Sequence, residues 1–219
     1  MRTLKRIVWD FNGTILDDGG PHFRAVNTLI RLTGGQEVTQ EQLAERFVIP
    51  VATFYGGQGC DIQLLNTSTA IYYKCYEYHA LDCQTHQYVP EILELLTAQK
   101  VEQIIVSNNT HESIHWHLER LHLGHHFSAV QANEYGNDVV HKQTKGDRVK
   151  ELVHGYGVEE VLIIGDTVEE IEIARKLGIR SISIVSGYQA KHRLEQAGPP
   201  FMLLDSFEHL LLALREGMS

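Results

Sequence analysis

The 219-residue sequence has no excess of positive charge: 19 lysines and arginines stand against 28 aspartates and glutamates, a formal net charge of −9. Because no basic patch offsets this charge, the composition argues against a nucleic-acid partner. No apolar run approaches the roughly 20 residues that a helix needs to cross a bilayer, so we expect no membrane partner. The first six residues run directly into an apolar strand, and we expect no signal peptide.

Cysteine is also scarce. Cys60, Cys75 and Cys83 have no Cys-x-x-Cys spacing and cannot all pair, so we expect reduced thiols and a cytoplasmic protein. Histidine, in contrast, is abundant: the chain has 13, and six lie between positions 111 and 126. His111 and His115 have the i,i+4 spacing of a helical metal pair. No cysteine or acidic residue accompanies them at a supporting spacing, so a solvated helix followed by a loop is favoured.

The distribution of apolar residues predicts an α/β fold. Short apolar runs at 4–9, 101–106, 161–164 and 181–185 indicate buried strands. Strands that alternate with helices imply a doubly wound parallel sheet. Helices are expected at 90–99, 112–121, 145–154, 169–177, 188–197 and 206–215, and further short strands at 127–131 and 201–204.

The stretch from residue 18 to residue 88 departs from this alternation and predicts a small helical cap domain inserted after the first strand. Thr39 and Gln42 have the spacing of a capping box at the start of one of its helices. The rest of the chain, residues 1–17 and 89–219, is expected to form the α/β core. The cap pattern consists of helices at 21–32, 39–47 and 61–79 and a Gly-rich connection at 50–59. The last of these helices carries four tyrosines expected to pack in the cap core, Tyr72, Tyr73, Tyr76 and Tyr78.

Polar clusters follow three of the predicted strands, at 10–14, 107–108 and 165–166. The carboxyl ends of strands in a doubly wound sheet can meet in one crevice. A carboxylate there can form an acyl-phosphate, and a second carboxylate can hold Mg²⁺, which prefers oxygen ligands beside a phosphate. The three clusters, with a lysine between the second and third, therefore predict a phosphoryl-transfer site.

The segment Asp10-Phe11-Asn12-Gly13-Thr14 resembles the first motif, Asp-x-Asp-Gly-Thr, of the haloacid dehalogenase superfamily. The resemblance covers nearly the whole chain and implies a Rossmann-like core with a helical cap. It implies that Asp10 is the nucleophile that attacks phosphorus, and that the Ser107 hydroxyl hydrogen-bonds the transferring phosphoryl group. Lys145 is the lysine expected to hold the phosphoryl oxygens, favoured over Lys142 because it opens the helix before the last motif.

The resemblance also implies a set of phosphate and metal contacts. Asp166 matches the acidic residue that binds Mg²⁺, and Glu170 occupies the second acidic position of that motif. For Glu170, a metal role and a favourable place at a helix N-terminus are equally supported. The expected phosphate contacts are Phe11, Gly13, Thr14, Ser107, Asn108 and Lys145. The expected Mg²⁺ ligands are Asp10, Asn12 (through its backbone carbonyl), Asp166 and Glu170.

Asn12 departs from the family pattern. The family's second aspartate protonates the leaving oxygen and then deprotonates the attacking water, work that typically contributes about 10²–10⁴-fold to the rate. An amide has no titratable proton, although it can donate a hydrogen bond to the leaving oxygen. Asn12 is therefore expected to leave metal and phosphate binding intact and to slow turnover. His22 and Asp17, near the cap hinge, are candidates for the missing proton transfer.

Residues 9–18 and 187–198 are similar to a phosphoglycolate-phosphatase-like branch with asparagine at this position, which favours a natural asparagine over an introduced one. This resemblance implies a Mg²⁺-dependent phosphatase for a small phosphorylated metabolite. Arg46 and residues 54–57 are candidate specificity contacts in the cap. The alternatives are phosphonatase or dehalogenase chemistry, which also lacks the second aspartate, and phosphometabolite binding without turnover. A phosphonatase would need a Schiff-base lysine, for which Lys74 is the one cap candidate.

Overall fold

The computed structural model describes residues 4–134, 144–198 and 202–216. Six parallel strands form one sheet in the order β3-β2-β1-β4-β5-β6. The strands are β1 (Arg6–Trp9), β2 (Glu102–Thr110), β3 (Ala129–Asn133), β4 (Val161–Gly165), β5 (Arg180–Ile184) and β6 (Met202–Leu204). The predicted doubly wound parallel sheet is confirmed. Because the strand order reverses between β1 and β4, the crevice at their carboxyl ends is where such a sheet binds ligands.

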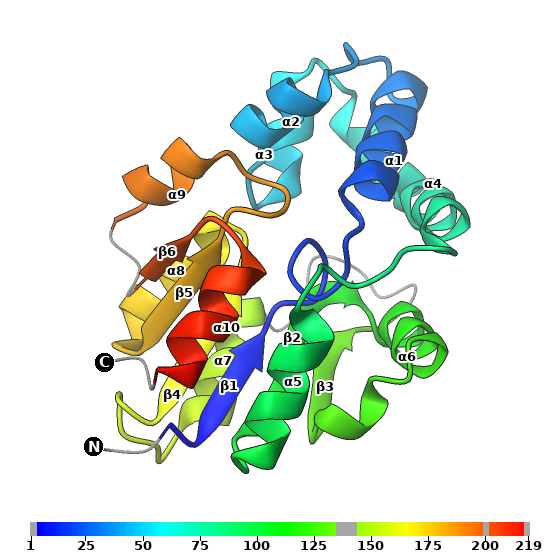
Figure 1. Ribbon diagram of the computed structural model, residues 1–219. Helices are drawn as coiled ribbons and strands as arrows, with labels where there is room; N and C mark the ends of the chain where they lie inside the picture. The colour runs from blue at the N-terminus through cyan, green and yellow to red at the C-terminus, as the bar shows by residue number, and fades with distance from the viewer. Residues whose placement is uncertain (1–3, 135–143, 199–201, 217–219) are drawn as a thin grey trace.

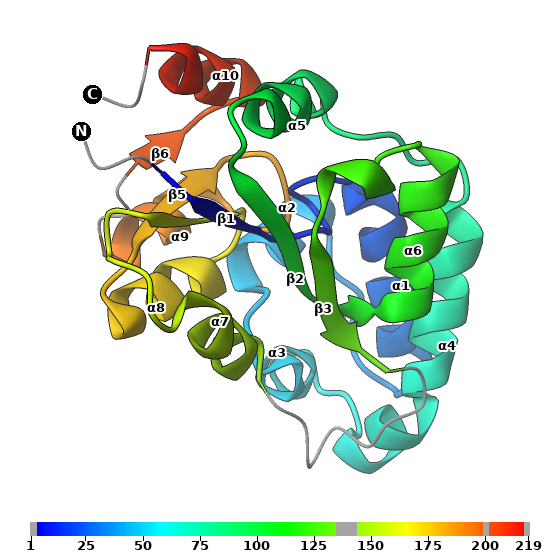
Figure 2. The same cartoon turned by 90° about the horizontal axis from the view of Figure 1, so that it is seen from below.

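Helices cover both faces of this sheet (Figures 1 and 2). Side chains of β1 alternate between two apolar clusters: Ile7 and Trp9 lie in one and Val8 lies in the other. The first cluster is closed by α5 (Val89–Ala98), α6 (His111–Arg120) and α10 (Phe207–Arg215), the second by α7 (Lys145–Val153) and α8 (Val168–Leu177). Burial on both faces explains why the strands are continuous apolar runs. None of the helices in the described ranges has the length and apolar character of a membrane span.

A second group of helices lies over the carboxyl edge of the sheet (Figure 1). It consists of α1 (Gly19–Leu32), α2 (Gln40–Arg46), α3 (Val51–Gly57) and α4 (Ile62–Ala80), and it has an apolar cluster of its own. The predicted capping box of Thr39 and Gln42 is present at the start of α2. The two connections to the core run together, since the Asp17 N–H donates to the Gln84 carbonyl over 2.9 Å. This pairing is compatible with the predicted cap of residues 18–88, whose bounds stay a prediction.

Two predictions about local structure are wrong. Residues 50–59 are not simply a Gly-rich connection, because α3 occupies most of them. Phe54 and Tyr55 are buried in the cap, and burial of two aromatic rings outweighs the weak helix propensity of the glycines that end α3. The helix expected at 188–197 begins later, as α9 (Lys191–Gln196), because Tyr188 contacts Asp166 at the carboxyl edge of the sheet and Gln189 contacts the cap.

His22 on α1 leads to a prediction about stability in acid. Its ring stacks on Tyr188 at 4.0 Å, and burial lowers its pKa to about 3. The pKa of an unfolded histidine is about 6.5, so the contribution of His22 to the free energy of unfolding is fully present above that pH. Between pH 6.5 and pH 3 the free energy of unfolding falls by about 1.4 kcal/mol per pH unit as the pH drops. The free energy of unfolding is measured by urea titration at pH 7 and at pH 5. Its decrease between the two pH values is expected to be roughly 2 kcal/mol smaller for His22→Phe than for the wild type. An equal loss in both proteins would contradict this assignment.

Candidate active site

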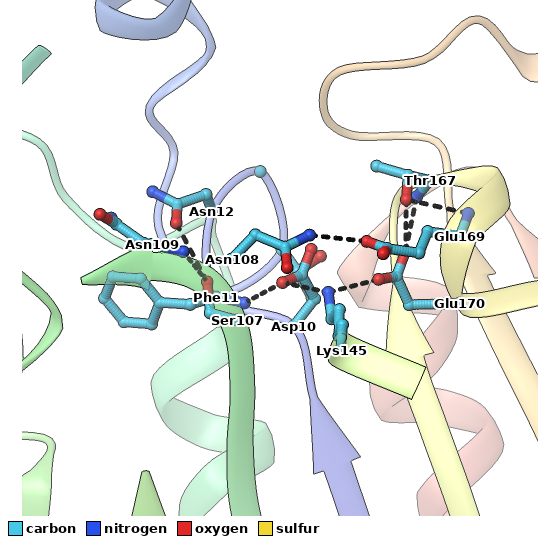
Figure 3. A network of polar contacts seen from close by, with 12 residues as sticks. Asp10, Phe11, Asn12, Ser107, Asn108, Asn109, Lys145, Thr167, Glu169 and Glu170 are labelled. Carbon is cyan, nitrogen blue, oxygen red and sulfur yellow. Dashed lines mark hydrogen bonds and ion pairs between the residues drawn. The ribbon is translucent and has the colours of Figure 1, made fainter. Parts of the chain in front are cut away.

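Three neighbouring strands deliver polar side chains to one edge of the sheet (Figure 3). Asp10 directly follows β1, Asp166 directly follows β4, and Ser107 lies within β2. The Asp10 N–H donates to the Ile164 carbonyl over 2.8 Å, which continues the pairing of β1 with β4 past the end of β1. Asp10, Ser107 and Asp166 are all buried. The expected convergence of the three polar clusters at the carboxyl edge is therefore present.

The Asp10 carboxylate contacts the rest of the protein through one of its two oxygens. Oδ1 accepts a hydrogen bond from the Phe11 N–H over 2.8 Å and lies 2.7 Å from Lys145 Nζ. In the described part of the chain, both contacts of this carboxylate fall on Oδ1. Oδ2 is consequently the oxygen that remains free to attack an electrophile.

Lys145 is the only ammonium group among the buried carboxylates described at this edge. It is the first residue of α7 and contacts both Asp10 and Glu170. Burial by itself would lower the pKa of Lys145, but these two carboxylates raise it above its ordinary value. Burial, and then the charge of Glu170, raise the pKa of Asp10, while Lys145 opposes them. Lys145 is therefore charged, and it cannot neutralise every carboxylate around it.

Glu170 is fully buried and uses both of its oxygens. One contacts Lys145, and the other accepts from the Thr167 N–H over 3.2 Å and the Thr167 hydroxyl over 2.6 Å. The second pair closes a capping box at the start of α8. A Cβ at Gly165 would collide with the Glu170 side chain, so this strand end requires glycine. The helix N-terminal role expected for Glu170 is present, and its metal contact stays a prediction.

The Ser107 segment is joined to its neighbours by side chains from three elements. The Ser107 hydroxyl oxygen accepts from the Asn109 N–H over 3.1 Å, and Asn108 donates to Glu169 over 2.8 Å. Arg148 on α7 donates to the Ser107 carbonyl over 3.0 Å and is itself buried. Sequence reasoning missed Arg148, although it lies one helical turn after Lys145. Its contacts hold the Ser107 loop against the helix that carries the lysine.

Asp166 supplies the observation that tests a metal at this edge. Its carboxylate accepts from the Thr14 hydroxyl over 3.0 Å and from the Tyr188 N–H over 2.7 Å, and its exposed fraction is 0%. Burial and the charge of Asp10 raise the pKa of Asp166 well above its ordinary value. A Cβ at Gly187 would collide with Asp166 Oδ2, so this backbone packs directly on the carboxylate. Two buried carboxylates with an excess of negative charge fit Mg²⁺.

The cap contacts the core beside this carboxylate. Gln189 is buried; its Oε1 accepts from the Val168 N–H over 2.7 Å, and its Nε2 donates to the Phe47 carbonyl over 2.9 Å. Nearby, the Ala190 N–H donates to the Ala44 carbonyl over 3.2 Å. One glutamine side chain therefore joins the end of α2 in the cap to the loop that follows Asp166.

Comparison with known proteins identifies the family of this chain. Residues 7–184 match the family model of haloacid dehalogenase-like hydrolases. The chain belongs to this family. It is 25% identical to a phosphoglycolate phosphatase of Aliivibrio fischeri over 232 aligned positions, which cover 96% of each chain. It is 28% identical to a phosphoglycolate phosphatase of Synechococcus elongatus, over 60% of this chain and 61% of that protein.

Solved structures of the family share the whole architecture. A haloacid dehalogenase-like hydrolase from Streptococcus pneumoniae superposes with a TM-score of 0.80 at 18% identity, over 98% of this chain and 100% of that one. A hydrolase from Pseudomonas syringae gives a TM-score of 0.75 at 16% identity, with the same coverage. At such identities the likeness shows the fold, and the α/β fold predicted from the resemblance is confirmed.

The structure brings together most of the residues that the family resemblance singled out. Lys145 contacts Asp10 as expected, and its rival Lys142 lies outside the described residues. Phe11 and Thr14 donate to Asp10 and Asp166, and their expected contact with phosphate stays a prediction. These two residues therefore orient the carboxylates of the haloacid dehalogenase-like site.

Asn12 is the residue at which the chain departs from the family, and its amide is fully engaged. Nδ2 donates to Asp18 Oδ2 over 2.5 Å and to the Tyr76 hydroxyl over 2.7 Å. Oδ1 faces the Ser107 hydroxyl at 3.4 Å. An amide nitrogen has two hydrogens, and both are used within the protein. In this structure neither hydrogen is left for a leaving oxygen, and Asn12 presents an acceptor to the site.

Asp18 is the carboxylate that orients this amide. It is fully buried, and besides Asn12 it accepts from the Gly13 N–H over 2.8 Å, from Tyr76, and from the Tyr188 hydroxyl over 3.0 Å. Burial raises its pKa, and the hydrogen bonds oppose the rise. Sequence reasoning named its neighbour Asp17, whose side chain is exposed. The second aspartate of the Asp17-Asp18 pair is thus the one that reaches Asn12.

Not all of the cap residues that were expected to contact the substrate line the catalytic edge. Phe54 and Tyr55 lie in the apolar cluster of the cap, so their rings support the cap and do not line the catalytic edge. Arg46 is exposed and donates to Gln58 over 3.4 Å. Tyr76 is buried with Ala25 and Ala80 as expected for cap core, and its hydroxyl also reaches the site through Asn12 and Asp18. Lys74, the Schiff-base candidate, is exposed.

Proposed function

We propose that the protein is a Mg²⁺-dependent phosphatase that hydrolyses a small, phosphoglycolate-like phosphomonoester through an aspartyl-phosphate on Asp10. The observation that carries the proposal is the state of the Asp10 carboxylate: Oδ1 is bound by Lys145 and by the Phe11 N–H, and Oδ2 is free. The names of the two curated relatives, both phosphoglycolate phosphatases, support this substrate class.

The reaction follows from these positions in two steps. Asp10 Oδ2 attacks phosphorus, the ester P–O bond breaks, and the leaving oxygen takes a proton from solvent water, because Asn12 has none to give. Water then attacks phosphorus, which releases inorganic phosphate and restores Asp10. Lys145 and the Ser107 hydroxyl hold the phosphoryl oxygens, and a fixed ammonium group in a dry site stabilises the charge that develops there. Glu170 holds Lys145 in place.

Asp10 and Asp166, with the Asn12 backbone carbonyl, are the residues that would hold Mg²⁺. When bound, the ion would neutralise charge on the phosphoryl oxygens. It would also offset the burial and the charge of Asp10 that together raise the pKa of Asp166. Glu170 is paired with the Lys145 ammonium, a contact that Asp166 does not have among the described residues, so we assign Glu170 to Lys145 and not to the metal.

Metal removal tests the proposal. We expect Mg²⁺-dependent release of phosphate from at least one member of a panel that includes phosphoglycolate and other short phosphomonoesters. EDTA should abolish the release, and excess Mg²⁺ should restore it, because the buried carboxylates need a cation to bind a phosphate dianion. Activity that is unchanged by EDTA would contradict the mechanism. Tight binding of a phosphometabolite without turnover would favour the binding-protein alternative, to which Asn12 lends support.

The Asn12–Asp18 contact gives a second prediction. Exchanging the two residues (Asn12→Asp with Asp18→Asn) should raise turnover of unactivated esters by about 10²-fold or more, since it supplies the missing acid–base group. Asn12→Asp alone should gain less and destabilise the fold, because it places a second carboxylate in contact with the fully buried Asp18. The measurement is the steady-state rate of all variants, with Asp18→Asn as the control that should show no gain. If the exchanged variant is no faster than the wild type, another group already moves the proton.

A further inference from the structure

Three side chains capable of binding a metal converge on a surface remote from Asp10. Glu94 lies on α5, and His125 and His126 lie in the short helix η1 (Gly124–His126). One ligand atom of each lies within 4.8 Å of the other two. The His125 and His126 rings lie 3.9 Å apart, between their centroids. The histidine-rich stretch, which the catalytic site does not use, therefore places two imidazoles beside a carboxylate.

A hydrogen bond fixes the tautomer of His126. The Thr97 hydroxyl donates to the Leu93 carbonyl over 2.9 Å, and its oxygen lies 2.9 Å from His126 Nδ1. The hydroxyl has one hydrogen, so with the Leu93 carbonyl as its acceptor we assign Nδ1 as the donor in this contact. The lone pair of His126 is therefore on Nε2. Metal-bound histidines commonly have such a partner on the second ring nitrogen, which fixes the ring and raises its affinity for the ion.

The neighbouring residues leave room for an ion. Glu94, His125 and His126 border a shallow surface hollow of about 540 Å³, together with Pro90, Glu91 and Leu95. Glu91 adds a second carboxylate to its wall. His111 and His115, the pair with helical metal spacing in the sequence, have other partners: His111 Nε2 accepts from the Ala132 N–H over 3.3 Å, and His115 Nδ1 donates to the His111 carbonyl over 2.8 Å.

We propose that Glu94, His125 and His126 form a binding site for Zn²⁺ or a similar late transition-metal ion. Imidazole nitrogen and carboxylate oxygen are ligands that Zn²⁺ favours, whereas Mg²⁺ prefers an all-oxygen set. Three protein ligands leave one tetrahedral position for water. The site is distinct from the catalytic edge, because α5 and η1 lead into the amino ends of β2 and β3. A bound ion would cross-link these two connections and stabilise the core.

The test is a calorimetric titration of the tag-free full chain, stripped of transition metals, with Zn²⁺. The buffer contains enough Mg²⁺ to occupy the catalytic carboxylates. We expect Zn²⁺ binding at this surface and a rise in melting temperature. His126→Ala and Glu94→Gln should each weaken binding by about tenfold or more. Thr97→Val, which removes the partner of Nδ1, should weaken it by roughly tenfold.

His115→Ala is the matched control, since it removes an exposed histidine of the same stretch that lies outside the three ligands. It should bind Zn²⁺ as the wild type does. If His126→Ala and Glu94→Gln retain wild-type affinity, or if His115→Ala loses as much as they do, the site does not exist. The melting temperature of each variant without Zn²⁺ shows whether the fold survives, and Glu94→Gln keeps the side-chain shape should His126→Ala unfold. The result is independent of phosphatase activity.

Discussion

Replacing Asp10 with asparagine is expected to reduce phosphate release by about 10⁴-fold or more while the protein remains folded. The amide cannot form an aspartyl-phosphate, because its nitrogen takes the place of the attacking oxygen. Its carbonyl oxygen can still accept from the Phe11 N–H and from Lys145, which bind Oδ1 in the native protein. The loss should therefore appear in kcat, and it is measured as inorganic phosphate released at saturating Mg²⁺ and substrate.

Asp17→Asn is the matched control for this variant. It makes the same chemical change at an exposed aspartate of the connection to the cap. Its rate should equal that of the wild type, and both variants should keep native-like melting temperatures. If Asp10→Asn retained activity comparable with Asp17→Asn, Asp10 would not be the nucleophile.

Replacing Lys145 with methionine should have the second largest effect, on both stability and rate. The substitution leaves the buried carboxylates of Asp10 and Glu170 without their shared cation. Breaking a buried ion pair by removing one partner costs about 3–5 kcal/mol. Loss of a fixed charge on the phosphoryl oxygens should also lower kcat by about 10²–10³-fold. Urea unfolding in EDTA at pH 8 and steady-state assays with Mg²⁺ measure the two effects.

Lys150→Met provides the comparison on the same helix, because Lys150 is exposed. An exposed substitution of this kind should change the free energy of unfolding by no more than about 0.5 kcal/mol. Lowering the pH to 5 should reduce the difference in the free energy of unfolding between Lys145→Met and the wild type, because protonation removes the unpaired charge of the buried carboxylates. Equal stability of the two lysine variants at pH 8 would show that Lys145 is not the counter-ion of this site.

The parts of the site that lie next to each other along the chain could be predicted from sequence. Asp10 ends an apolar run, and a strand buried on both faces leaves its following polar residue at the carboxyl edge of the sheet. Lys145 could be placed because it opens the helix before the last motif, and Thr144 is the N-cap of that helix, α7, in the structure. For both Asp10 and Lys145, the type of side chain and its position at the end of a strand or the start of a helix predict a place in the active site.

The contacts that orient Asn12 could not be predicted, because they depend on packing between distant segments. Tyr76 is 64 residues from Asn12, and Tyr188 is 170 residues from Asp18. The sequence around each tyrosine is the same as that around a tyrosine that only fills an apolar core. The sequence therefore predicts Tyr76 as a core residue and gives no sign of its contact with Asn12. Helix α3 was missed for a related reason, since its two buried aromatic residues lie beside glycines.

The most direct test of the account is a search for a phosphoryl group on Asp10. With an aryl or acyl phosphate the leaving group needs no proton, so Asp10 should be phosphorylated quickly. Asn12 cannot deprotonate the attacking water, so the phosphoenzyme should accumulate. Mass spectrometry of acid-quenched wild-type protein should find one phosphoryl group on the peptide that contains Asp10, and less of it in the Asn12–Asp18 exchange variant. Phosphate release under the same conditions with that peptide unmodified at every quench time would contradict the mechanism.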